Sequence, residues 1–123
     1  MDRGGLYDGR RGAQPMLAVR IAISRFTNEH FPGWVECLLV DVHGRTWKFV
    51  EKVPVVSTED LWSDSEYPRE GVIACTVLEC KDDSQGRQVM TIDTKAPWFV
   101  ESVEGATVFE VFADQLSDDD SGA

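Results

Sequence analysis

The amino-acid sequence predicts an all-β or β-rich α+β domain, built as a small antiparallel barrel or sandwich of about six strands. Three observations indicate this class. Short apolar segments alternate with period two, turn residues separate them at short intervals, and a helical N-terminal signature follows the third expected strand. A chain of 123 residues fits one domain and is long enough to bury a core without a disulfide or a metal.

The first expected strand begins at Leu17. Apolar side chains occupy every second position from there, and β-branched residues at this period are typical of a half-buried strand. The residues that share the apolar face are Leu17, Val19, Ile21 and Ile23. The segment Phe31-Pro32-Gly33-Trp34 is expected to form a type II turn, because proline presets the first central residue and glycine takes the positive φ of the second.

Two further strands follow this turn. We expect the second strand over Trp34–Val42 and the third over Thr46–Val53, where Pro54 ends the strand because proline lacks a backbone donor. The residues between the two strands close a hairpin, either as His43-Gly44 or as the longer segment Asp41–Arg45.

One short helix is expected after the third strand. Ser57-Thr58-Glu59-Asp60-Leu61-Trp62 begins with hydroxyl and acidic residues, which favour a helix N-terminus. Pro68 follows closely enough to limit this helix to one or two turns.

The second half of the sequence predicts a hairpin and a last strand. Strands over Val72–Cys80 and Arg87–Asp93 are joined by a polar turn that ends at Gly86. Phe99–Val103 is expected as either a short strand or an ordered loop, and Thr107–Ala113 as the last strand. Three strands, a short helix and a hairpin are similar in order to the elements of an OB-type barrel.

Composition divides the chain into three parts. Residues 1–15 contain four glycines and little to bury, so we expect a flexible leader before a domain over residues 16–115, with Met16 as an alternative start. Residues 116–123 are small and acidic and are expected to form a disordered tail. No signal-peptide segment follows the first methionine, and the three cysteines are an odd number, which favours reduced thiols in the cytoplasm.

The formal net charge of -10 is concentrated in two segments. Residues 57–70 hold five acids and one base, and residues 101–123 hold seven acids and no base, so the rest of the chain is nearly neutral. Neutralising phosphates requires clustered Lys and Arg, and this charge therefore argues against binding to duplex nucleic acid. The apolar runs are too short to span a membrane, and we expect no membrane partner.

The sequence lacks the motifs of common catalytic, metal and cofactor sites. CxxC, HExxH and GxSxG do not occur, and no phosphate-binding glycine motif opens a helix. The three cysteines are Cys37, Cys75 and Cys80, and two or three of them are interpreted as buried core thiols. We therefore predict no catalytic residue, no metal ligand and no cofactor.

The surplus of aromatic residues supports the main functional hypothesis. Trp34 and Trp47 are expected in the core, whereas other large aromatics lie outside regular strands, where they either cover the core or form a contact surface. Acids flank these aromatics, and we expect a non-enzymatic interaction module that binds a basic protein partner. A homo-oligomer would use the same surface or an exposed strand edge. The expected partner-binding residues are Trp62, Trp98, Phe99, Asp60, Asp64, Glu66, Glu101 and Glu104.

The alternative hypothesis is a small-ligand-binding barrel or a modest enzyme that uses carboxylates at the barrel mouth. Acids that lie inside strand patterns are either at the rim of the sheet or buried with a partner. The expected pocket residues are Glu51, Asp93, Glu36 and His43, with Cys37 as a further candidate. This hypothesis requires a concave pocket that contains at least one of these acids together with a partner.

Overall fold

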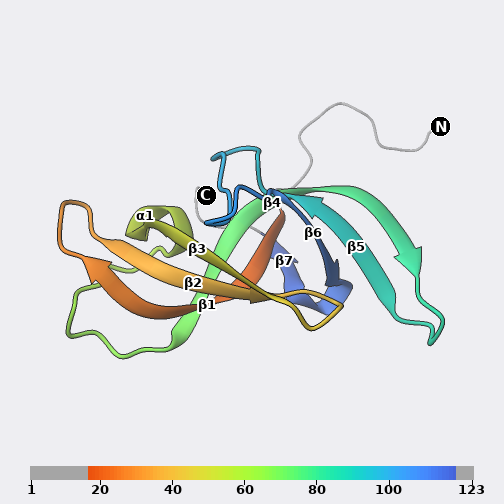
Figure 1. The fold of residues 1–123 in the computed structure, drawn as a ribbon, viewed down its shortest axis with the longest axis horizontal. Coiled ribbons are helices and arrows are strands. Elements are labelled where there is room, and N and C mark those ends of the chain that lie inside the picture. Colours follow the sequence, from red (N-terminus) through yellow and green to blue (C-terminus); the bar gives the residue numbers. More distant parts are fainter. Residues whose placement is uncertain (1–16, 119–123) are drawn as a thin grey trace.

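The protein, seen in a computed structural model that describes residues 17–118, is one antiparallel sheet curled into a half-barrel (Figure 1). One short helix, α1 (Val53–Val56), follows the third strand, so the predicted fold class is confirmed. A 3-10 turn, η2 (Ala113–Gln115), precedes the last strand. The strands are β1 (Leu17–Asn28), β2 (Trp34–Val40), β3 (Thr46–Lys52), β4 (Arg69–Asp82), β5 (Gln88–Asp93), β6 (Val108–Phe112) and β7 (Leu116–Asp118).

The two longest strands of the curled sheet, β1 and β4, change from one neighbour to another along their length. β1 pairs with β4 along Leu17–Ile23 and with β2 from Ala22 onward, while the short β7 pairs with the start of β1. β4 pairs with β1 along Arg69–Cys75 and with β5 along Thr76–Asp82. The strand order is therefore β3-β2-β1-β4-β5-β6, and β3 and β6 stand at its two ends.

The core fills the inside of the curl, where β3 and β6 approach each other. The Phe109 ring of β6 packs edge-on against Trp47 and Phe49 of β3, with ring centroids 5.2 and 5.6 Å apart. The backbone N–H of Val42 donates a 3.0 Å hydrogen bond to the carbonyl oxygen of Glu110, which joins the β2–β3 hairpin to β6. The largest fully buried side chains are Phe49, Ile23, Leu39, Ile73 and Ile92.

Three five-residue loops share one hydrogen-bonding pattern, two in hairpins and one within the β5–β6 connection. In the loop Asp41–Arg45, the carboxylate of the first residue accepts the backbone N–H groups of the third and fifth residues, at 2.9 and 3.0 Å. The fourth residue, Gly44, has a φ of 79°. The loops at 83–87 and 102–106 repeat this pattern with an Asp carboxylate and a Ser hydroxyl as acceptors. Of the two alternatives for the first hairpin, the longer one is therefore correct.

The predicted position of the helix, residues 57–62, is wrong. The helix is formed by Val53–Val56 instead, with Pro54 in its first turn, where a missing N–H removes no intrahelical hydrogen bond. The helix ends when the backbone N–H of Ser57 donates a 3.0 Å hydrogen bond to the carbonyl oxygen of Val53. The acids of the expected helix belong to an irregular connector between α1 and β4.

The turn between β1 and β2 also differs from the prediction. Gly33 has the expected positive φ, 94°. Its backbone N–H donates a 2.7 Å hydrogen bond to the carbonyl oxygen of His30, so the turn spans residues 30–33 rather than the type II turn expected over residues 31–34.

Smaller corrections concern the ends of elements. β2 ends at Val40, and β4 extends beyond the predicted strand at both ends. Residues 99–103 form a loop that is tied to β3 by a 2.8 Å hydrogen bond from the backbone N–H of Val103 to the carbonyl oxygen of Lys48. Leu116–Asp118, expected in the tail, form β7, so the predicted tail boundary at residue 116 is corrected. The expected leader and the end of the tail lie outside the described residues.

Candidate functional site

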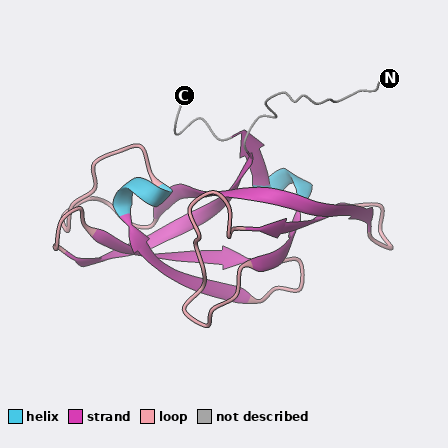
Figure 2. Cartoon of the chain, turned by 90° about the horizontal axis from the view of Figure 1, so that it is seen from above, coloured by secondary structure: helices cyan, strands magenta, loops and turns pink. Residues whose placement is uncertain are grey.

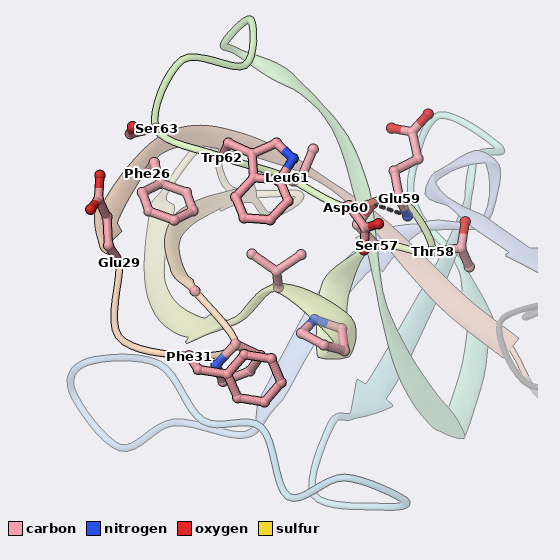
Figure 3. A pocket seen from close by; sticks show the side chains of 14 residues that line it. Phe26, Glu29, Phe31, Ser57, Thr58, Glu59, Asp60, Leu61, Trp62 and Ser63 are labelled. Carbon is pink, nitrogen blue, oxygen red and sulfur yellow. Dashed lines mark hydrogen bonds between the residues drawn. The ribbon is translucent and has the colours of Figure 1, made fainter.

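An apolar groove of about 500 Å³ lies beside α1. One wall is the end of β1 with the β1–β2 turn, the opposite wall is the connector over residues 57–63, and α1 forms the floor. Figure 3 shows Phe31 and Trp62 on opposite sides of this groove, with Phe26 beside Trp62. The groove therefore joins two segments that are separated by β2 and β3 in the sequence.

The wall from the β1–β2 turn is held by backbone hydrogen bonds. The N–H of Val53 donates to the carbonyl oxygen of Gly33 at 2.9 Å, which ties the turn to the start of α1. A Cβ atom on Gly33 would lie 3.1 Å from the Phe26 ring, so glycine lets this ring line the groove. The turn leaves the Phe31 side chain 93% exposed.

The connector wall is held in place by Leu61. Its side chain is buried in the core, and the neighbouring Trp62 side chain is 64% exposed. The backbone N–H of Trp62 donates to Oγ of Ser65 at 2.9 Å, and the hydroxyl of Tyr67 donates to the carbonyl oxygen of Trp62 at 2.7 Å. The exposed indole thus stands on a backbone that is fixed on both sides.

Within residues 17–118, the charged side chains that line the groove are all acidic: Glu29, Glu59 and Asp60. Glu59 forms an ion pair with Arg69 of β4. Glu29 and Asp60 have no ion-pair partner among residues 17–118, and Figure 3 shows them toward opposite ends of the groove. The groove therefore combines an apolar floor with two carboxylates that have no ion-pair partner in the described part of the chain.

Only Asp60 and Trp62 of the eight expected partner-binding residues line this groove. Asp64 and Glu66 lie further along the connector, outside the lining. Trp98 and Phe99 are each 60% exposed but belong to the β5–β6 loop, which Figures 1 and 2 show as a separate projection. Glu101 and Glu104 lie on that loop as well, and Glu104 forms a 2.7 Å ion pair with Arg45.

Glu36, expected in the alternative ligand pocket, lies on the outer face of the sheet. Its carboxylate accepts hydrogen bonds from the Ser24 hydroxyl at 2.8 Å and the Arg25 guanidinium at 3.2 Å, and Lys48 lies 3.5 Å away. The Ser24 and Arg25 hydrogen bonds lower the pKa of Glu36. These contacts give the buried carboxylate a structural role across β1, β2 and β3.

The other three residues of that expected pocket are dispersed. His43 Nε2 lies 2.8 Å from Oε1 of Glu110, and Asp93 accepts the backbone N–H of Lys95 at 2.9 Å. Glu51 is half-buried, and burial raises the pKa of its carboxyl group. Burial also raises the pKa of Cys37, to about 12. The structure brings none of these residues into the apolar groove.

The aromatic wall on the β1–β2 turn is not among the sequence predictions. The pattern Phe31-Pro32-Gly33 predicts only a turn, although a phenylalanine at a turn tip is itself a signal for a contact surface. The lining residues without a predicted binding role include Phe26, Glu29, Phe31, Pro32, Val53 and Pro54.

Comparison with models of protein families, with curated protein sequences and with solved structures gives no significant match. Within residues 17–118, no helix has the length and apolarity needed to cross a membrane. The same residues contain no cluster of three His, Cys, Asp or Glu side chains that could hold a metal ion.

Proposed function

We propose that this protein is a non-enzymatic interaction module that binds a basic, partly apolar segment of a partner protein in the groove beside α1. The observation that carries the proposal is the pair Phe31 and Trp62, both strongly exposed on opposite walls of one apolar groove. Exposed aromatics grouped in a concave site are typical of binding surfaces, and tryptophan is over-represented among residues that dominate binding energy.

The size and the fixed walls of the groove favour a short peptide segment. A volume of about 500 Å³ lies in the range of sites that enclose a few side chains. Both walls are tied by backbone hydrogen bonds to α1 or within the connector, so little ordering is required on binding. A pre-organised site loses less affinity to the ordering of its own loops.

The charge of the groove favours a basic partner. Among the described residues, Glu29 and Asp60 have no ion-pair partner and no Lys or Arg lines the groove. A lysine or arginine side chain can pack its aliphatic stem on an aromatic ring while its charged group approaches a carboxylate. Complementary charge also speeds encounter and disfavours acidic partners.

We also propose that the protein functions in the cytoplasm. Cys80 is an exposed thiol, and such a thiol persists in a reducing compartment. The proposal about the groove does not depend on this location.

The test is a selection of random peptides displayed on phage against the immobilised protein, followed by calorimetric titration of the selected peptides. We expect the peptides to combine Lys or Arg with large apolar residues. Trp62→Ala should weaken their binding at least roughly tenfold. Trp98→Ala is the matched control, because its indole is similarly exposed but does not line the groove, and its binding should equal that of the wild type. Selected peptides without basic residues, or unchanged binding to Trp62→Ala, would overturn the proposal.

A further inference from the structure

The second half of β4, Thr76–Asp82, has one edge that no strand covers within residues 17–118. It pairs with β5 on one side, and pairing with β1 on the other side ends at Leu17 and Cys75. Figure 1 shows this half of β4 as the outermost strand at the end of the sheet opposite α1. An open strand edge presents unpaired backbone N–H and C=O groups to another chain.

The hydrogen-bond pattern identifies which groups face outward. The backbone N–H of Asp83 donates to the carbonyl oxygen of Arg87 at 2.8 Å, so the backbone of Asp83 faces the strand across the hairpin. Hydrogen-bonded and non-hydrogen-bonded pairs alternate in an antiparallel ladder. The direction of the backbone groups alternates from Asp83 toward the N-terminus of β4. Lys81 and Glu79 therefore form backbone hydrogen bonds with β5, whereas the backbone groups of Asp82 and Cys80 point to the open edge.

We propose that this edge pairs with the same edge of a second copy of the chain, antiparallel and with the two-fold axis at Cys80. In this register Glu79 of each copy faces Lys81 of the other, so two opposite-charge pairs form. Both residues are exposed, and Glu79 has no ion pair among the described residues. The two residues would be non-hydrogen-bonded neighbours, in which side chains approach most closely.

Neighbouring registers are less favourable. A two-fold axis at Asp82 would place the two Asp82 carboxylates opposite each other, and like charges in this position destabilise pairing. A two-fold axis at Leu78 would place Glu79 of each copy opposite Val77 of the other, where the strand is irregular, and would form no opposite-charge pair along Thr76–Cys80. A β-bulge between Val77 and Glu79 also limits the regular edge to the residues that follow it.

The proposal does not rest on the groove, because the two sites lie at opposite ends of the sheet (Figure 1). Lys81 forms a 3.1 Å ion pair with Glu110 in its own chain, and its ammonium group can serve a second carboxylate. The short length of the paired edge predicts a weak dimer that forms at high protein concentration.

Sedimentation velocity over a concentration series tests the proposal by exchanging the charges. We expect the wild type to dimerise, and Glu79→Lys and Lys81→Glu each to weaken dimerisation at least roughly tenfold, because each creates two like-charge contacts. The double variant Glu79→Lys with Lys81→Glu restores opposite charges and should dimerise like the wild type.

Two controls test whether dimerisation depends on the open edge of β4 and not on another contact. Glu110→Gln removes the partner of Lys81 within the chain and should leave the dimer intact. Mild oxidation should cross-link wild-type dimers through Cys80, and Cys80→Ser should abolish the cross-link. A wild type that stays monomeric at every concentration, single variants that dimerise normally, or a double variant that does not recover would each overturn the proposal.

Discussion

The backbone N–H of Val53 donates a 2.9 Å hydrogen bond to the carbonyl oxygen of Gly33, which joins the first residue of α1 to the β1–β2 turn. This bond fixes the distance between one wall of the groove and its floor. The opposite wall is anchored separately by the buried side chain of Leu61. The proposed binding site is therefore formed by the fold before any partner arrives.

Gly33→Ala should destabilise the protein and disturb the groove. The residue has a φ of 94°, a conformation that costs an L-residue roughly 1–2 kcal/mol. The new Cβ would also lie 3.1 Å from the Phe26 ring, which lines the groove. Urea unfolding should show the loss of stability. Gly86→Ala is the control for backbone strain alone, because it has a similar φ of 81° in open space and lies in the β4–β5 loop. Equal peptide binding by Gly33→Ala and Gly86→Ala would contradict this account of the wall.

Neutralising the acids of the groove should weaken the binding of a selected basic peptide. Glu29→Gln and Asp60→Asn should each reduce affinity roughly two- to fivefold at low salt, because exposed ion pairs contribute up to about 1 kcal/mol. Wild-type affinity should also fall as salt is added. Asp64→Asn changes a connector acid that does not line the groove and should bind normally. Affinity that is indifferent to salt and to both substitutions would exclude an electrostatic contribution.

Asp41 should contribute stability that is lost in acid. Burial opposes its ionisation, but hydrogen bonds from the Trp47 indole and from two backbone N–H groups outweigh burial and lower its pKa. A carboxyl group with a lower pKa in the folded state stabilises the protein fully above its unfolded value, and this stability is lost as the pH falls through the folded value. As the pH is lowered below 3.8, the free energy of unfolding should therefore decrease less steeply for Asp41→Asn than for the wild type. If the free energy of unfolding changes equally with pH in the two proteins, Asp41 does not contribute to the loss of stability in acid.

Thiol reagents should modify Cys80 in the folded protein and leave Cys37 intact. Cys80 is exposed, whereas Cys37 is buried and its pKa is raised to about 12, so it holds little reactive thiolate at neutral pH. Titration with a chromogenic disulfide should detect one rapid thiol, and all three after unfolding in denaturant. The rapid phase should be missing in Cys80→Ser, and its persistence there would contradict the burial of the core thiols.

The strands could be predicted from the sequence because period-two patterns such as Leu17–Ile23 directly encode a half-buried strand. The helix position could not, because Val53-Pro54-Val55-Val56 has a β-branched composition that predicts a strand end. Packing decided the outcome there, since Val53 and Val56 are both buried.

The groove was only partly predictable for a related reason. Trp62 and Asp60 stood out as an aromatic and an acid outside regular strands. Phe26 and Phe31 lie far from them in the sequence and reach them only through the pairing of β1 with β2 and the position of α1. Sequence patterns give the faces of strands but not which loops meet at one end of the sheet.

The most direct test of the proposed function maps where a selected basic peptide binds, by amide chemical-shift changes in the nitrogen-15-labelled protein. If the peptide binds in the groove, the largest changes occur in the β1–β2 turn around Phe31 and Gly33 and in the connector around Leu61 and Trp62. Changes centred on the β5–β6 loop around Trp98, with the groove amides unaltered, would contradict the proposed function.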